Sequence, residues 1–142
     1  MRKYFLFSIR KEYYDVYYKN PLVLYKTLEN LYHLKKENIN FGLSLYKQIC
    51  NIIDVDRLKL YFEQVCIKKK DNKYLLRYNK ETILFSLYYP CIVCKTGKNY
   101  PLGLKVINYY DRNLFVCDFE NKDYFFLDRN GIKTTKYKYN YS

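Results

Sequence analysis

Apolar residues recur along this chain with two different spacings, and the changes in spacing divide it into predicted strands and helices. The first apolar run, residues 3–9, is continuous enough to form a strand that is buried on both faces. Residues 12–19 carry tyrosines at helical spacing and predict a short helix. Asn20 and Pro21 suit the cap and the first turn of a second helix, which carries a leucine stripe.

The middle of the chain predicts two more helices. Beyond a polar connector at residues 35–38, residues 40–53 carry leucine and isoleucine on one side, which indicates a third helix. Asp54 or Asp56 can cap a fourth helix. This helix ends before the basic run at residues 68–72, which we interpret as a solvated turn.

Shorter β-type segments dominate the second half of the chain. Residues 73–78 and 82–95 are predicted strands of a hairpin, and Pro90 favours a bend or an edge position within the second of them. The final elements are a short helix and a second hairpin, at residues 102–110, 113–119 and 124–127.

Together these elements predict an α/β fold of the α+β type, with a mixed sheet of about five strands covered by helices. A chain of 142 residues has the usual length of one domain and buries a sizeable core without metal or disulfide support. We therefore expect a single domain over residues 1–142. Residues 133–142 alternate lysine with tyrosine and predict a flexible basic tail or an added edge strand.

Composition changes this picture little. The chain has 20 Tyr, 9 Phe and no Trp, and it is rich in Lys, Asn and Ile, as expected for an AT-rich coding sequence. Its net charge of +12 gives a weak attraction to polyanions. Because the lysines are scattered rather than clustered along the chain, this charge does not by itself indicate a nucleic-acid site.

The five cysteines do not predict a disulfide framework, because their number is odd and no signal peptide is recognisable. Cys91 and Cys94 have the spacing of zinc and redox motifs, but a strand places them on opposite faces and no second pair completes four ligands. No apolar run approaches the roughly 20 residues of a membrane span. We expect no metal, no cofactor, no membrane contact and a cytoplasmic location.

The sequence does not indicate an enzyme. His33 is the only histidine and the 4 glycines are dispersed, so neither a nucleophile with a base nor a glycine-rich phosphate loop is recognisable. Asp118 is an acidic residue in a strongly apolar setting. It is either a functional acid or a cap of the last hairpin turn, and its position near the end of a strand favours the cap.

Tyrosines in the first predicted helix are candidate contact residues. Tyr13 and Tyr17 lie one turn apart, as do Tyr14 and Tyr18, so if one pair packs on the core the other faces outward. Exposed tyrosines supply a large contact area with little loss of rotamer entropy. The alternative is that all four are half-buried packing residues.

The two ends of the chain resemble a known family. Residues 4–12 read Tyr-Phe-Leu-Phe-Ser-Ile-Arg-Lys-Glu and lead into the aromatic helix, and residues 114–127 carry an Asp-Phe hairpin. These segments, and the order of elements over nearly the whole length, resemble the sporulation inhibitor of replication family, SirA, of low-GC Gram-positive bacteria.

This resemblance implies an α/β protein that binds the N-terminal domain of the replication initiator DnaA and inhibits initiation of DNA replication, without catalysis or a small-molecule substrate. The family's partner surface combines aromatics on the first helix with polar residues on a later helix. The matching positions here are Tyr13, Tyr17, Gln48 and Asn51. Gln48 and Asn51 are expected three residues apart on one helical face.

Two other classes of function stay open. The first is a small basic nucleic-acid-binding module, in which lysines contact phosphates and tyrosines stack on bases. The scatter of the lysines, the shortage of arginine and the lack of a recognised motif count against it, so direct nucleic-acid binding is not expected. The second is a structural or phage-derived interaction protein.

Overall fold

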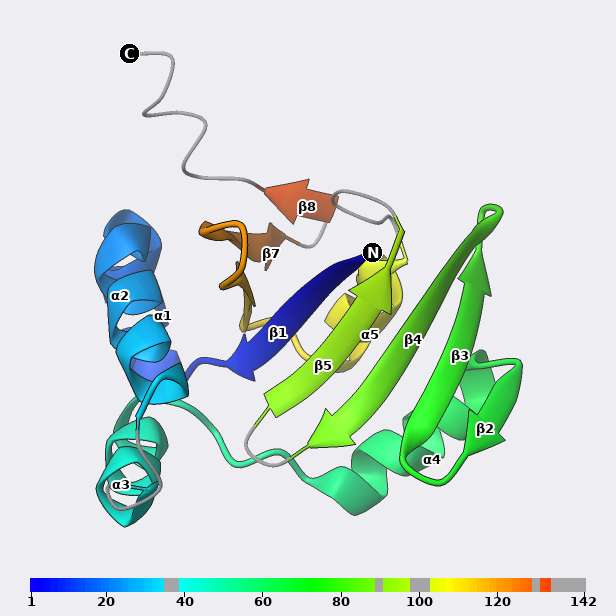
Figure 1. Ribbon diagram of the computed structural model, residues 1–142, viewed down its shortest axis with the longest axis horizontal. Coiled ribbons are helices and arrows are strands. Elements are labelled where there is room, and N and C mark those ends of the chain that lie inside the picture. The colour runs from blue at the N-terminus through cyan, green and yellow to red at the C-terminus, as the bar shows by residue number, and fades with distance from the viewer. Residues whose placement is uncertain (35–38, 89–90, 98–102, 129–130, 134–142) are drawn as a thin grey trace.

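The protein is built on one antiparallel β-sheet that carries helices on both faces (Figure 1). The structure, a computed structural model, describes residues 1–34, 39–88, 91–97, 103–128 and 131–133. The strands form one sheet, and the helices pack on its two faces. This arrangement confirms the predicted α+β fold.

The element bounds and the order of the strands follow from the hydrogen bonds. The strands are β1 (Arg2–Ser8), β2 (Lys68–Lys70), β3 (Lys73–Tyr78), β4 (Glu81–Tyr88), β5 (Cys91–Thr96), β6 (Leu114–Asp118), β7 (Asp123–Asp128) and β8 (Gly131–Lys133). The helices are α1 (Lys11–Lys19), α2 (Pro21–Tyr32), α3 (Ile39–Ile49), α4 (Val55–Val65) and α5 (Leu104–Tyr110). Within the described residues the strand order is β2-β3-β4-β5-β1-β6-β7-β8.

Strand β1 lies at the centre of the sheet. It pairs with β5 along one edge and with β6 along the other. Tyr4 and Leu6 point into one core cluster, and Phe5 and Phe7 point into the other. None of these four side chains is more than 9% exposed. The predicted strand at residues 3–9, including its burial on both faces, is confirmed.

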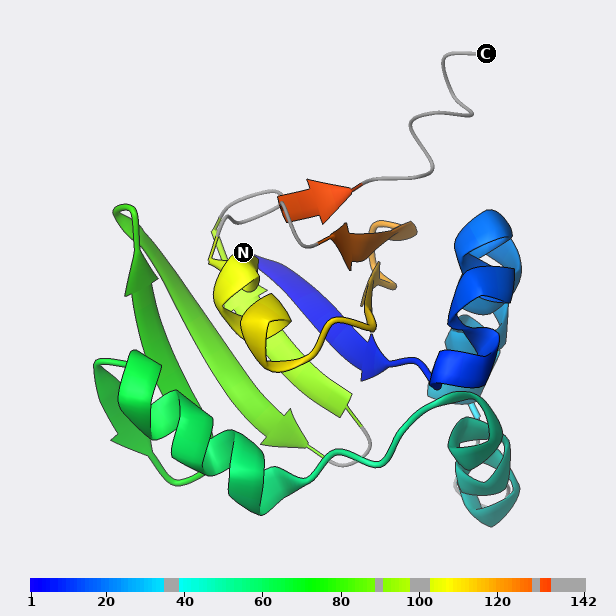
Figure 2. The same ribbon diagram turned by 180° about the vertical axis from the view of Figure 1, so that it is seen from behind.

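Helices α4 and α5 cover one face of the sheet (Figure 2). Leu58 and Phe62 of α4 and Ile107 of α5 are fully buried there, in one core cluster with side chains of β1 and of β3 to β7. Gly103 precedes the first residue of α5 and lies close to the sheet on this face. A Cβ at that position would lie 2.2 Å from Cδ1 of Ile83, so the lack of a side chain allows the close contact.

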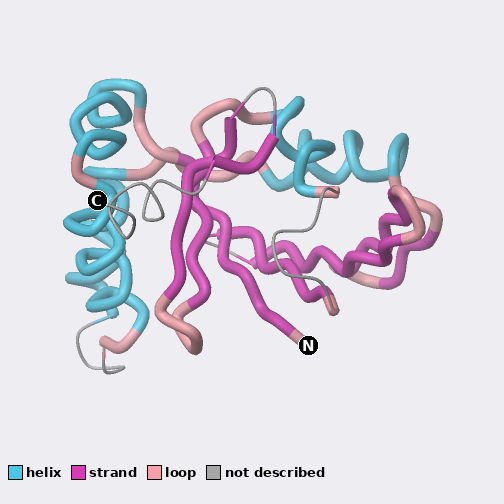
Figure 3. Tube along the Cα trace, turned by 90° about the horizontal axis from the view of Figure 1, so that it is seen from above, coloured by secondary structure: helices cyan, strands magenta, loops and turns pink. Residues whose placement is uncertain are grey.

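Helices α1, α2 and α3 cover the other face, but only over its β5, β1, β6 and β7 part. Tyr25 and Leu28 of α2 and Tyr46 of α3 are buried in this layer. Seen from above, α1–α3 gather at one end of the twisted sheet, whereas α4 and α5 lie behind the other part (Figure 3). The β2, β3 and β4 part of this α1–α3 face therefore has no helix in front of it (Figure 1).

A short stretch of backbone pairing joins the end of β1 to the end of α3. Ile9 and Cys50 form an isolated antiparallel bridge, and the N–H of Asn51 donates to the carbonyl of Ser8 at 2.8 Å. This extended pairing ends α3 at Ile49. The predicted helix over residues 40–53 was therefore too long at its C-terminal end.

The sheet is larger than predicted, and it is wholly antiparallel within the described residues, where a mixed sheet of about five strands was expected. The basic run that was interpreted as a turn forms β2, the predicted strand at residues 82–95 divides into β4 and β5, and β8 is added after β7. Strand β2 has no apolar alternation that could predict it, and backbone pairing with β3 holds it in the sheet. The predicted connector at residues 35–38 and the tail beyond residue 133 lie outside the described residues.

An ion-pair network ties the start of β1 to the last hairpin. Nε of Arg2 donates to Oδ2 of Asp118 at 2.8 Å, and Nη2 of Arg2 donates to Oδ2 of Asp123 at 3.2 Å. Asp118 is 1% exposed, and its Oδ1 accepts the backbone N–H of Asn121 at 3.1 Å. Asp118 therefore caps the hairpin turn, as its position in the sequence favoured, and Arg2 compensates its buried charge.

Replacing Asp118 with alanine should lower the free energy of unfolding by about 2–3 kcal/mol, because it removes the turn cap and leaves Arg2 without its nearest carboxylate. The loss lies at the lower end for a buried pair because the Arg2 side chain keeps 19% exposure. Urea unfolding near neutral pH measures it. Glu120→Ala, at an exposed position in the same turn, should change stability by less than about 0.5 kcal/mol. Equal losses in both variants would contradict the role of Asp118.

Candidate functional site

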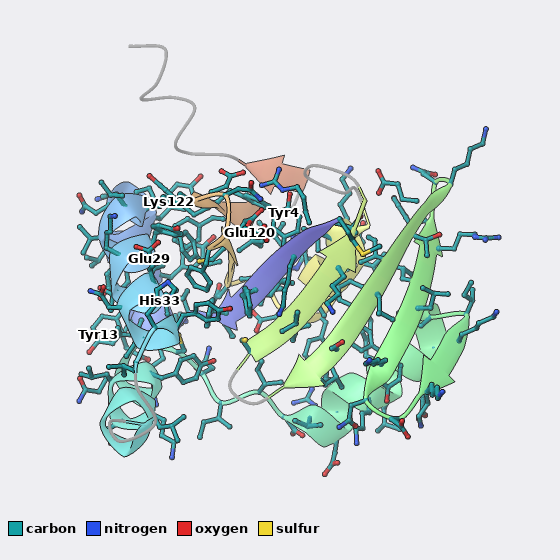
Figure 4. All side chains as sticks on the ribbon, in the orientation of Figure 1. Tyr4, Tyr13, Glu29, His33, Glu120 and Lys122 are labelled. Atoms are coloured by element: carbon teal, nitrogen blue, oxygen red, sulfur yellow. The ribbon has the colours of Figure 1, made fainter. Side chains whose placement is uncertain are left out.

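Tyr13 and Tyr17 lie on α1, as predicted, but they differ in exposure. Tyr13 is 41% exposed, whereas Tyr17 is half-buried against the core layer formed by α1–α3. The centroids of the two rings are 6.3 Å apart. Figure 4 shows Tyr13 on the side of α1 that faces away from the sheet. Tyr13 is therefore the more accessible of the two.

Tyr14 and Tyr18 hold α1 on the sheet. The centroid of each ring lies 5.2 Å from that of Phe126 in β7, and the two tyrosines stack on each other at 5.9 Å. The expectation that one pair packs while the other faces outward is met for Tyr14, Tyr18 and Tyr13. Tyr17 differs, because it packs partly on the core as well.

The start of α1 and the end of α3 lie side by side. Nε of Arg10 donates to the carbonyl oxygen of Lys47 at 2.8 Å. Desolvation, with smaller effects of Tyr13 and Cys50, raises the pKa of the Tyr17 hydroxyl. Gln48 is exposed on the last turn of α3. The structure thus brings Gln48 to the same region as the tyrosines of α1.

Asn51 lies beyond the end of α3, and its side chain turns toward β1. Its Nδ2 donates to Oγ of Ser8 at 3.1 Å and to the carbonyl oxygen of Ile9 at 3.4 Å. Gln48 and Asn51 therefore do not share a helical face, in contrast to the expectation, because the helix ends between them. The amide of Asn51 stabilises the junction of β1 and α3.

Three aliphatic side chains on α1 and α2 are exposed. Val16 is 57% exposed, Leu22 is 52% exposed and Val23 is 56% exposed. Asn20 connects the two helices here: its Nδ2 donates to the carbonyl of Val16 at 3.4 Å, and its own carbonyl accepts the N–H of Val23 at 3.2 Å. We call Tyr13, Val16, Leu22 and Val23 the α1–α2 surface.

The sequence carries a signal for this surface in the aliphatic residues at the start of α2, apart from the tyrosine pairs of α1. Leu22 and Val23 lie off the buried stripe of Leu24 and Leu28, so their apolar side chains serve no purpose in the core. Charged residues of both signs are exposed around the surface, namely Lys11, Glu12, Asp15, Lys19 and Lys26. An apolar centre within a polar rim is the usual anatomy of a protein–protein interface.

The thiols are shielded from solvent to different degrees. Cys91 faces the α1–α3 layer and Cys94 faces the α4–α5 layer, which confirms that the two residues lie on opposite faces of a strand. Burial raises the pKa of Cys50 and of Cys91 to about 12, and that of Cys66 to about 11. Among the described residues no three Cys, His, Asp or Glu side chains are grouped as metal ligands. His33 is exposed at the end of α2.

A cavity of about 420 Å³ lies between the end of β1, α4 and α5. Oγ of Ser8 donates to Oδ2 of Asp111 at 2.6 Å and accepts from Asn51. Arg57 and Tyr110 also line the cavity. Its described lining residues include no histidine, cysteine or lysine, so Ser8 has no base other than a carboxylate beside it.

The fold and these surfaces define an α+β protein with an exposed aromatic and aliphatic surface on its first two helices. Within the described ranges, no helix is long and apolar enough to cross a membrane. No protein-family model matches the chain, and no curated protein matches it. The function must therefore be inferred from the surfaces and from the resemblance of the two chain ends.

In the folded protein, Cys66 should react first with a thiol reagent, because it is half-buried while Cys50, Cys91, Cys94 and Cys117 are buried. The buried thiols should react only as fast as the chain opens. At moderately alkaline pH most of the Cys50 and Cys91 thiols should stay protonated in the folded protein, since burial raises the pKa of both to about 12. Labelling followed by mass spectrometry, with the urea-unfolded chain as control, measures this. Rapid labelling of Cys91 or Cys94 in the folded state would contradict their burial.

Proposed function

We propose that this protein is a regulator that acts by binding another protein through the α1–α2 surface, and that the partner is the N-terminal domain of the replication initiator DnaA. In this proposal it inhibits initiation of DNA replication by occupying that domain, as the resemblance to the SirA family implies. The observation that carries the proposal is the exposed ring of Tyr13, accompanied by three exposed aliphatic side chains on the same two helices.

Removal of the α1–α2 surface from water supplies the binding free energy. Fully burying an aliphatic or aromatic side chain contributes about 1.5–3 kcal/mol relative to leaving it exposed. Val16, Leu22 and Val23 are each more than half exposed, so a partner can cover most of their surface. Tyr13 adds a hydroxyl that accepts or donates a hydrogen bond at the rim of the contact. These features favour a protein partner with a complementary apolar groove.

The other predicted site residues have different roles in this proposal. Tyr17 supports the ring of Tyr13, whose centroid lies 6.3 Å from its own. Gln48 is exposed and supplies directional hydrogen bonds at the rim. Asn51 is a positioning residue, because its Nδ2 holds Ser8 at 3.1 Å and so ties the end of α3 to β1.

Inhibition by occupancy requires no catalytic group, no cofactor and no small-molecule substrate. The partner domain and the chromosomal origin lie in the bacterial cytoplasm, so the proposal includes a cytoplasmic location. It extends to sporulation control only through the resemblance of the two chain ends.

Tyr13→Ala should weaken binding to the isolated N-terminal domain of DnaA from the same organism by about 10- to 30-fold, because it removes the aromatic centre of the contact. Isothermal titration calorimetry measures the affinity, and thermal unfolding checks that the variant stays folded. Tyr13 is preferred to Tyr17 for this test, because Tyr17 also packs on the core.

Tyr109→Ala is the matched control, because Tyr109 is a tyrosine of α5 with 68% exposure, outside the α1–α2 surface. It should leave the affinity unchanged within about twofold. Wild-type affinity in the folded Tyr13 variant would refute the site. A lack of binding by the wild-type protein would refute DnaA as the partner.

A further inference from the structure

The face of the sheet that carries α1–α3 is uncovered over β2, β3 and β4 (Figure 1). Six exposed basic side chains lie on this uncovered part and on the adjoining ends of β5 and β1, a region that we call the open face. They come from four separate segments of the chain, yet the two-residue period of the strands places them on the same side. The six, all exposed, are Lys3, Lys68, Lys70, Lys73, Arg77 and Lys95.

The register of the strands aligns these side chains in rows. The first row, from β2 to β1, is Lys68, Leu75, Leu84, Lys95 and Lys3. In the next row, Lys70 of β2 is directly opposite Lys73 of β3. Two pairs of lysines, Lys70 with Lys73 and Lys95 with Lys3, therefore face each other across neighbouring strands.

In the part of the chain that the structure describes, the strands of the open face place no carboxylate on this side. Glu63 lies on the α4 side, where it pairs with Lys69 at 2.7 Å. Glu81 also points to the face that α4 and α5 cover, where one of its carboxylate oxygens accepts the N–H of Gly103 at 3.4 Å. Asp71, in the exposed turn between β2 and β3, forms no ion pair with another described residue. The open face thus carries uncompensated positive charge.

Protection of the sheet edge explains only part of this arrangement. Lysines on an edge strand discourage pairing with another chain, and Lys68 and Lys70 lie on the edge strand β2. Lys73, Lys95 and Lys3 lie on interior strands, where no edge needs protection. Like charges directly opposite each other destabilise a sheet. The stability of the fold therefore gives no reason for the facing lysines.

We propose that the open face binds the phosphate backbone of duplex DNA. A phosphate bound between two facing lysines replaces the repulsion between them with attraction. Neutralisation of the phosphates by the lysines also releases condensed counterions from the duplex. The six cations span four steps between neighbouring strands, about 19 Å. Over that length a duplex presents about five phosphates on each strand, at about 3.4 Å apiece. Sequence-independent contact with the backbone follows from this chemistry.

The side chains of the open face favour duplex DNA over other polyanions. Single strands are bound largely by stacking on aromatic rings, and the described side chains of this face expose none. Duplex RNA is distinguished through its 2′-hydroxyls, for which Thr82 is the one exposed hydroxyl among these described positions. The core of a protein–protein interface is usually apolar and depleted in charge, and the open face offers only the half-buried Leu75 and Leu84.

The open face is separate from the α1–α2 surface. Strands β2–β4 and helices α1–α3 lie at opposite ends of the molecule (Figures 1 and 3). DNA binding at the open face therefore stands independently of the proposed partner of α1 and α2.

Fluorescence anisotropy with a labelled duplex of about 20 base pairs tests the proposal. Six phosphate contacts give a slope of log K against log salt concentration of about −5, at about −0.9 per contact. The triple variant Lys70→Gln, Lys73→Gln, Lys95→Gln should bind at least about tenfold more weakly at low salt. It should also reduce the magnitude of the slope by about 2.7, because three phosphate contacts are lost.

A matched control has the same change of net charge at the other end of the molecule. Lys11→Gln, Lys19→Gln, Lys26→Gln removes three exposed lysines of α1 and α2, which lie around the α1–α2 surface and outside the open face. Its affinity for the duplex should stay within about twofold of the wild type. Thermal unfolding should show that both triple variants are folded, and the open-face variant should be no less stable than the wild type because repulsion between its lysines is relieved.

Equal losses in the two triple variants would overturn the proposal, because they would show a dependence on net charge alone. Absence of duplex binding by the wild type at low salt would also overturn it. Tighter binding of a single strand or of duplex RNA would assign the face to a different nucleic acid. Displacement of the duplex by polyglutamate as readily as by unlabelled duplex would point to an acidic protein segment instead.

Discussion

The burial of β1 on both faces is the constraint on which the rest of the structure depends. Tyr4 and Leu6 are fully buried only because α4 and α5 cover one face, and Phe5 and Phe7 require the α1–α3 layer on the other. Both edges of β1 are also paired, with β5 and β6. Arg2 fixes the start of the strand to the last hairpin. The N-terminal segment therefore organises elements from the whole chain.

The two helical layers are offset along the sheet, and this offset gives the molecule two unlike surfaces. Eight strands at about 4.8 Å spacing make a sheet about 34 Å wide, whereas a helix with its side chains covers only about 10 Å. Helices α1–α3 crowd over β1, β6 and β7, so α1 and α2 present apolar side chains outward at that end. The same face over β2–β4 stays uncovered, and the basic side chains of the open face lie there and on the adjoining ends of β5 and β1. Unlike partners can therefore bind at opposite ends.

Local sequence pattern predicted those elements whose formation depends on neighbouring residues. The continuous apolar run of β1, the tyrosine helix α1 and the hairpin of β6 and β7 were recognisable from period and turn composition. Asp54 accepts the N–H of Arg57 and Asp118 that of Asn121, because a carboxylate beside unpaired backbone N–H groups caps a helix or a turn wherever it occurs. The same helical period indicated that one tyrosine pair of α1 could face outward, but not which pair.

Contacts between distant parts of the chain decided three features that the local sequence pattern did not predict: the strand β2, the end of α3 and the pairing of Lys3 with Lys95. Pairing with β3 made a strand of the lysine run at β2, and the bridge of Ile9 to Cys50 ended α3 before Asn51, turning that amide toward β1. Lys3 and Lys95 became neighbours only through the register of β1 and β5. The sequence determined most of the segments that form strands or helices and which side chains alternate along them. Only the tertiary structure decided which strands are neighbours, because the order and register of strands depend on burial of the whole sheet and not on any local period.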